Sequence, residues 1–241
     1  MGKANKSKKL SLHTVLKNSY ASKDKQKTAL DSYGYAYDPE LSNDNQQVYY
    51  NKSKNKLLYS IAGTHNLSDI GTDAYLAMGH LKDTNRYKES ESTLKKAKSK
   101  YGVDKATIAA HSLGGSIGQY IGSANDQVLT LDKGATIGQR SRDNEKAYRT
   151  SGDAVSLMNA NSKNMTTLAN PKKKTTFLGT LFNSGVVGLV KNALQSHDVD
   201  NIQDSGINID DDKPKKLPIG IKNVFPRAYD KNPNDSLLPN Y

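Results

Sequence analysis

The sequence predicts an α/β domain with a mostly parallel central sheet and helices on both faces. Two observations lead to this prediction. Short apolar segments alternate with longer segments of helical period along most of the chain, and the apolar run at residues 106–110 lacks the polar alternation of a half-exposed strand. Such a strand is buried on both faces, which requires helices on each side of the sheet.

The first expected elements form a hairpin followed by two helices. Residues 48–50 and 57–61 favour strands, and the turn-like segment at residues 51–54 joins them. Apolar residues at helical spacing then predict helices over residues 68–80 and 86–101.

The remaining elements alternate between strand and helix. Strands are expected at residues 106–110, 127–131 and 147–151, with helices at residues 113–123 and 181–195. The first of these strands is expected to end in the candidate active site.

Ser112 lies between the strand at residues 106–110 and the helix that follows it. A nucleophilic serine at such a corner needs small neighbours two residues away on each side, and Ala110 and Gly114 meet this need, with Gly115 next in the chain. Ala110 replaces the first glycine of the usual G-x-S-x-G pattern. The helix start would also direct N–H groups toward the serine oxygen, where charge develops in acyl transfer. The alternative is a glycine-rich turn with an incidental serine. No phosphate-binding glycine pattern is present.

A serine nucleophile of this type needs an acid and then a histidine further along the chain. His197 is the only histidine after Ser112, and His111 is expected to point to the other side of the strand end. Asp153 follows a strand-like run and a small turn, where such an acid belongs. Asp132 is the weaker choice, and its replacement is expected to cost little activity. The alternative roles are an Asx-turn aspartate for Asp153 and a helix-end histidine for His197.

With these residues in place, the chain resembles the class 3 lipases, the fungal triacylglycerol-lipase type of α/β-hydrolase. The resemblance covers about residues 30–202 and depends on separate pieces of sequence. Leu58 to Thr64 is similar to the strand that ends in Arg-Gly-Thr or Arg-Gly-Ser, and the elbow is similar to Gly-His-Ser-Leu-Gly-Gly. The remaining pieces are Ser68-Asp69, Ser151-Gly152-Asp153 and Ser196-His197-Asp198.

This resemblance implies a serine hydrolase that acts on lipid esters without a cofactor or a metal ion. Ser112 would be the nucleophile, His197 the general base and then acid, and Asp153 the orienting carboxylate. The backbone and hydroxyl of Thr64 and the backbone N–H of Leu113 would form the oxyanion hole. Gly114 and Gly115 would be the elbow glycines.

Two departures from the family pattern bear on this expectation. Ala62 stands where the family often has arginine, which predicts that a supporting salt bridge is absent. Thr64 and Ser112 are only 48 positions apart, which leaves little room for a long apolar lid and makes glycerides in oil droplets a doubtful substrate.

Composition suggests that both chain ends lie outside the core of the domain at residues 28–204. Hydrophobic residues make up 35% of the 241 residues, and the mean hydropathy is −0.75. Residues 1–27 form a basic arm with eight lysines and one aspartate. An amphipathic helix in this arm would dock on the domain or lie on an anionic membrane, with nucleic acid a less favoured partner. Residues 205–241 hold most of the prolines and predict an extended tail.

Several classes of protein are excluded by what the sequence lacks. The absence of cysteine excludes disulfides, thiolate metal sites and cysteine catalysis. Without a signal peptide or a long apolar segment, an intracellular or particle-associated protein is expected. The excess of lysine over arginine is typical of AT-rich genomes, including those of large DNA viruses. The alternative to an ester hydrolase is therefore a lipase-like structural or binding module, such as a virus-particle component with assembly partners at its termini.

Overall fold

The computed structural model describes residues 8–64, 80–134, 142–151, 153, 156, 164–168, 197, 199 and 206–210. The helices expected at residues 68–80 and 181–195, and Ser68-Asp69, lie almost entirely outside these residues. So does most of the tail expected at residues 205–241.

The described residues form one seven-stranded sheet in which the strands follow each other in chain order. The strands are β1 (Ala36–Tyr37), β2 (Gln46–Asn51), β3 (Lys56–Ile61), β4 (Ala106–His111), β5 (Gln127–Leu131), β6 (Glu145–Thr150) and β7 (Met165–Leu168). The pairs β1–β2 and β2–β3 are antiparallel, and every pair from β3 to β7 is parallel. The expected fold class, an α/β fold with a mostly parallel central sheet, is confirmed.

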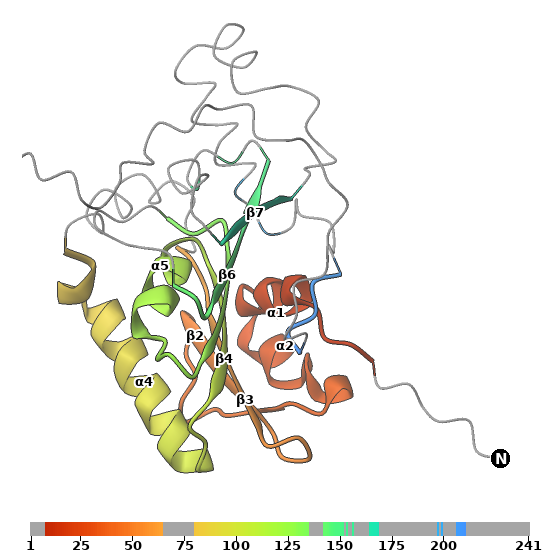
Figure 1. Ribbon diagram of the computed structural model, residues 1–241. Coiled ribbons are helices and arrows are strands. Elements are labelled where there is room, and N and C mark those ends of the chain that lie inside the picture. Colours follow the sequence, from red (N-terminus) through yellow and green to blue (C-terminus); the bar gives the residue numbers. More distant parts are fainter. Residues whose placement is uncertain are drawn as a thin grey trace, which may run out of the picture.

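Helices cover both faces of the sheet (Figure 1). On one face lie α1 (Leu12–Ser19) and α2 (Lys23–Thr28), and on the other lie α4 (Asn85–Tyr101) and α5 (Ser112–Ile121). Two short 3-10 helices complete the described elements, η1 (Asp31–Tyr33) and η2 (Leu81–Asp83). The helix expected at residues 86–101 is α4, which begins one residue earlier because the Thr84 side chain accepts from the Tyr87 N–H.

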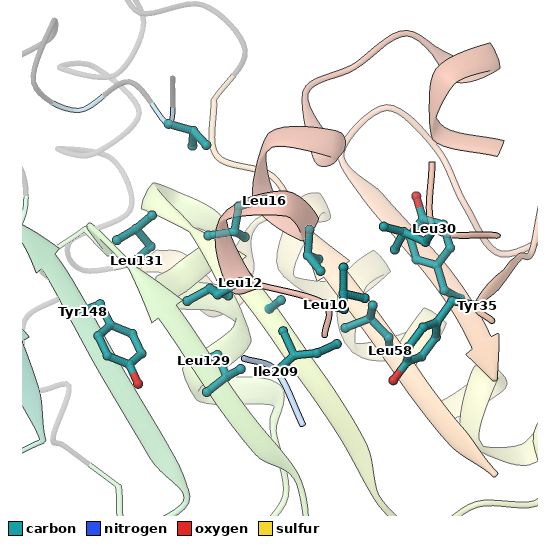
Figure 2. Packing of buried hydrophobic residues seen from close by; sticks show 14 of the residues in the cluster. Leu10, Leu12, Leu16, Leu30, Tyr35, Leu58, Leu129, Leu131, Tyr148 and Ile209 are labelled. Atoms are coloured by element: carbon teal, nitrogen blue, oxygen red, sulfur yellow. The ribbon is translucent and has the colours of Figure 1, made fainter. Parts of the chain in front are cut away.

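Each face of the sheet has its own hydrophobic cluster. Figure 2 shows the cluster beneath α1, where Leu12 and Leu16 of the helix belong to the same cluster as Leu58 and Leu129 of the sheet. The second cluster, on the face of α4 and α5, includes Ile61, Ile108 and Ile117. Strand β4 contributes to both clusters, so the sheet is buried on both sides at the strand that leads into Ser112.

Residues 10–20 pack on this core, which is the docked alternative that the sequence left open for the amphipathic helix at residues 1–27. The amphipathic helix forms as α1, but its apolar face packs on the sheet, with Leu12 2% and Leu16 0% exposed. That face is therefore not available to a bilayer, because burying it in the core already removes it from water. Contact of the lysines with an anionic membrane or with nucleic acid stays a prediction.

The first residues of the expected tail also pack on the domain. The N–H of Leu12 donates to the Ile207 carbonyl at 2.7 Å, and the N–H of Ile209 donates to the Leu10 carbonyl at 3.0 Å. Ile209 is buried, and Asp210 forms an ion pair with Lys56 at 2.7 Å. Residues 206–210 are thus part of the folded unit, because their alternating apolar side chains fill the space beside α1.

No helix within the described ranges has the length and hydropathy needed to cross a bilayer.

Candidate active site

Ser112 occupies a strained turn between β4 and α5. Its φ is +54°, in the left-handed region that side-chain-bearing residues seldom adopt, and it is the first residue of α5. This is the geometry of a nucleophile elbow, in which the turn holds the serine hydroxyl out at the carboxyl end of a parallel strand.

The two elbow glycines allow α5 to pack closely on the sheet. A Cβ at Gly114 would lie 2.6 Å from the Ile61 carbonyl oxygen, and one at Gly115 would lie 2.6 Å from the Lys133 Cβ. Both distances are shorter than real Cβ contacts, so any larger residue would move the helix start away from β3 and β5. The sequence prediction that small residues are required after Ser112 has a direct steric cause.

The structure brings Ser112, His197 and Asp153 into one hydrogen-bonded row. His197 Nε2 is 2.6 Å from Ser112 Oγ, and His197 Nδ1 is 3.0 Å from Asp153 Oδ1. All three side chains are buried, with exposed fractions of 3%, 1% and 1% in that order along the row. The row matches the arrangement in which a carboxylate orients a histidine that can remove a proton from a serine.

The Asp153 carboxylate is held in its charged form. Burial by itself would raise its pKa, but the charge of His197 and hydrogen bonds from His197 and Ser156 outweigh this and lower the pKa below 3.8. The Ser156 N–H donates to Asp153 Oδ2 at 2.8 Å, so the second carboxylate oxygen is also satisfied. Asp153 is therefore an anion over the whole neutral range.

His111 lies beside His197, which corrects the expectation that it points to the other side of the strand end. The two ring centroids are 4.9 Å apart, and His111 Nδ1 is 2.6 Å from the Tyr20 hydroxyl. Burial lowers the pKa of His111 well below 6.5, and the nearby His197 lowers it further. His111 is thus a neutral ring packed against the candidate base.

Asp132 is also close to the row, although it is bonded differently from Asp153. Its carboxylate accepts from the Thr150 N–H at 2.5 Å and the Thr150 hydroxyl at 2.7 Å. It is completely buried, and its φ is +46°. Burial raises the pKa of Asp132 to about 7, and the charge of Asp153 raises it as well. Asp132 is therefore buried next to the row, and the small effect on activity that the sequence predicts for its replacement stays a prediction.

One group of potential metal ligands occurs within the described part of the chain. Ligand atoms of His111, Asp132 and His197 all lie within 4.8 Å of one another. Both His197 nitrogens are already in hydrogen bonds with Ser112 and Asp153, so a metal ion could bind only by breaking the row. The donor set therefore fits hydrogen bonding better than metal binding.

The two expected oxyanion residues flank Ser112. Leu113 is the second residue of α5, where backbone N–H groups have no acceptor within the helix. Thr64 is half-buried and follows Gly63, at which a Cβ would lie 2.7 Å from the Ser112 Cβ. The chain between β3 and Thr64 thus passes directly beside the serine.

At Ala62, where the sequence predicts that a supporting salt bridge is absent, Arg86 of α4 contacts the backbone instead. Its guanidinium Nη2 donates to the carbonyl oxygens of Ala62 and Gly63, the latter at 3.0 Å. Neither Arg86 nor Tyr20 was a candidate from the sequence. Both act through backbone atoms of a distant segment, and such contacts leave no recognisable pattern of residue types.

The buried carboxyl of Asp132 predicts a specific pH dependence of stability. Its folded pKa of about 7 is above the ordinary value of 3.8, so the folded protein binds this proton more tightly than the unfolded chain. The stability that this tighter binding contributes is fully present below pH 3.8 and is lost as the pH rises toward about 7. In Asp132→Asn this loss should be absent, because the amide stays neutral, fits the positive φ and can still bond Thr150.

The measurement is the free energy of unfolding in urea at each pH from 4 to 8. The free energy of unfolding of wild type minus that of Asp132→Asn isolates the contribution of Asp132. The subtraction is needed because the lowered pKa of His111 also changes the stability below pH 6.5, with the opposite sign. Asp143→Asn, at an exposed aspartate, is the control for replacing a carboxylate by an amide outside the core. A difference that stays constant with pH would show that Asp132 is ionised throughout.

Comparison with solved structures finds several fungal lipases, all at low similarity. A lipase–propeptide complex from Rhizomucor miehei is 14% identical with a TM-score of 0.38, and the match covers 62% of each chain. A fungal lipase–inhibitor complex is 15% identical with a TM-score of 0.42, covering 62% of this chain and 72% of the other. The Lip2 lipase from Yarrowia lipolytica is 16% identical with a TM-score of 0.32, covering 51% of this chain and 61% of the other.

The chain thus spans less than two thirds of the Rhizomucor and Yarrowia proteins. No protein-family model matches it, and no curated protein sequence is significantly similar to it. Function is therefore inferred from the side chains around Ser112.

Proposed function

We propose that the chain is a serine hydrolase that cleaves carboxylic esters of lipids through an acyl-enzyme on Ser112. The observation that carries this proposal is the row of two hydrogen bonds from Ser112 through His197 to Asp153, at 2.6 Å and 3.0 Å, on a positive-φ elbow. The similarity of the motifs to class 3 lipases supplies the substrate class.

The reaction begins with attack of Ser112 Oγ on the ester carbonyl. His197 Nε2 removes the hydroxyl proton as the C–O bond forms, and the charged Asp153 stabilises the resulting imidazolium through Nδ1. The tetrahedral intermediate carries its negative charge on the former carbonyl oxygen. Thr64 and the Leu113 N–H donate to this oxygen, which lowers the barrier because the donors are already oriented.

The intermediate then collapses to the acyl-enzyme. His197 gives its proton to the leaving alcohol oxygen, and the ester C–O bond breaks. In the second half of the reaction, His197 removes a proton from water, and the resulting hydroxide attacks the acyl carbon. Ser112 Oγ leaves with the proton from His197, and a free fatty acid is released.

The neutral state of His111 helps this chemistry. A second cation 4.9 Å from the His197 ring would oppose formation of the imidazolium, and burial prevents His111 from becoming that cation. The elbow thus places an uncharged, rigidly packed ring against the base.

Labelling with a fluorophosphonate probe tests the proposal directly. The probe phosphonylates only a serine whose hydroxyl is activated, so the native chain should be labelled and Ser112→Ala should not. Ser116→Ala is the matched control, because Ser116 is a second buried serine of α5 that donates to the Gly134 carbonyl, and its labelling should stay as in wild type. A folded native chain that resists the probe would overturn the proposal and favour a lipase-like binding or structural module.

A further inference from the structure

We propose that Arg86 and Tyr20 are positioning residues that orient the Thr64 N–H as an oxyanion donor, one from each side of the segment Ala62 to Thr64. This inference rests on the function proposed above. Arg86 comes from α4 and Tyr20 from the end of α1, and these helices cover opposite faces of the sheet (Figure 1). We call the pair the Arg86–Tyr20 clamp.

Arg86 fixes the direction of the Thr64 N–H through the peptide bond that Thr64 shares with Gly63. The guanidinium Nη2 donates to the Gly63 carbonyl oxygen at 3.0 Å. In a planar trans peptide the C=O and the N–H point in opposite directions, and no cis peptide occurs in the described chain. With the Gly63 oxygen held toward Arg86, the Thr64 N–H must point away from Arg86.

Tyr20 holds the preceding peptide from its other end. The Tyr20 hydroxyl oxygen accepts from the Gly63 N–H at 2.5 Å, while Arg86 Nη2 donates to the Ala62 carbonyl of the same peptide. Both ends of this peptide are thus bonded, so it cannot rotate without breaking a hydrogen bond at one end. Two consecutive peptides before Thr64 are therefore fixed.

Tyr20 also connects this segment to the elbow. Its hydroxyl is 2.6 Å from Nδ1 of His111, the residue directly before Ser112, and the two rings meet edge to face at 5.6 Å. One hydroxyl thus ties the oxyanion segment to the nucleophile strand. This sets the distance between the two sides of the oxyanion hole, which is the geometric quantity that transition-state stabilisation depends on.

The charge of Arg86 adds an electronic effect. A cation at the carbonyl end of a peptide polarises that peptide and makes its N–H a stronger donor, as in other hydrogen-bonded chains. The benefit appears only when negative charge develops on the substrate oxygen. Loss of Arg86 should therefore lower kcat and leave KM nearly unchanged.

Steady-state kinetics on a soluble p-nitrophenyl ester, with each variant's melting temperature recorded, test the clamp. Arg86→Met keeps the length of the side chain and removes its donors, and kcat should fall about 10- to 100-fold, less than the 10²–10³ for deletion of a donor itself. Tyr20→Phe removes one hydroxyl, and its kcat should fall about 3- to 10-fold, since one hydrogen bond of the segment is lost. Arg86→Lys, which keeps the charge and some donors, should recover part of the kcat lost in Arg86→Met.

Two matched controls separate positioning from general support of the fold. Arg142 donates from Nη1 to the Gln119 and Tyr120 carbonyls at the far end of α5, and the buried Tyr49 hydroxyl donates to the Gln26 carbonyl. Arg142→Met and Tyr49→Phe should lower the melting temperature with kcat unchanged. The clamp is overturned if Arg86→Met and Tyr20→Phe match these controls in kcat, or if they raise KM instead. Absence of any Ser112-dependent turnover in wild type is a different result, which would overturn the proposed function itself.

Discussion

Alanine at Ser112 or His197 should lower kcat for a soluble p-nitrophenyl ester by about 10⁵- to 10⁶-fold, and alanine at Asp153 by about 10⁴-fold. In the proposed mechanism Ser112 supplies the bond-forming oxygen and His197 carries its proton, so loss of either should stop acylation. In the same mechanism Asp153 only orients His197 and stabilises its charge, so its loss should cost less. Turnover in excess substrate, with circular dichroism to verify the fold, gives these ratios.

The double variants distinguish a cooperating row from three independent residues. Because each hydrogen bond in the row is useful only when the other is present, Ser112→Ala with His197→Ala should be hardly slower than either single variant. If the double variant instead lost kcat by the product of the two single losses, Ser112 and His197 would act independently, which would contradict a cooperating row. The exposed Asp143 is the matched control for Asp153, and Asp143→Ala should keep wild-type kcat. Asp132 is unsuitable as a control because it is buried beside His197.

The elbow could be predicted from sequence because every part of it is local. An apolar strand, one serine and glycines at fixed spacing lie within a dozen residues, and the steric demand that selects Gly114 acts on the first turn of α5. The order of serine, acid and histidine in the chain then reduced the choice of base to His197. Local pattern and chain order together carried most of the candidate site.

The choice between Asp153 and Asp132 shows where sequence reasoning weakens. Both follow strands, and both are buried near His197. Only tertiary geometry separates them, since Thr150 takes up the Asp132 carboxylate while Asp153 faces Nδ1 of His197. A difference of this kind depends on hydrogen bonds between segments, which residue types alone do not specify.

The position of α1 and the existence of strands β1 and β7 could not be predicted from the sequence for a related reason. Amphipathicity predicted the helix at Leu12 to Ser19, but it does not identify the surface that covers the apolar face, and that surface is the sheet. Strands β1 and β7 are only 2 and 4 residues long, too short for a hydrophobic period to be recognised.

The site residues Arg86 and Tyr20 could not be predicted either. They contact backbone atoms of residues 23 and 43 positions away, and a backbone atom is the same whichever residue type carries it.

Gly114→Ala is the substitution outside the row from which we expect the largest loss. In an open helix this change would stabilise by about 1 kcal/mol, because alanine has the higher helix propensity. Here the new Cβ would meet the carbonyl oxygens of Ile61 and Ala62, which are backbone atoms that cannot turn aside. Overpacking of this kind costs about 1–3 kcal/mol or more, which exceeds the gain in helix propensity. The melting temperature should therefore fall by several degrees.

The same displacement should be visible in catalysis. Moving the first turn of α5 away from β3 shifts Ser112 and Leu113 relative to Thr64, and a misplacement of about 1 Å can cost about 10²-fold in rate. Gly118→Ala, one turn later, is the matched control, because its Cβ would meet side-chain atoms of Ala110 and Ile108 at 3.1 and 3.2 Å. We expect that variant to stay within about 1 kcal/mol of wild type, since the Ile108 side chain can turn slightly and the contact with the Ala110 Cβ is relieved by a very small shift of the helix. If Gly114→Ala instead melts and turns over like Gly118→Ala, α5 does not approach the end of β3 as closely as the elbow geometry requires.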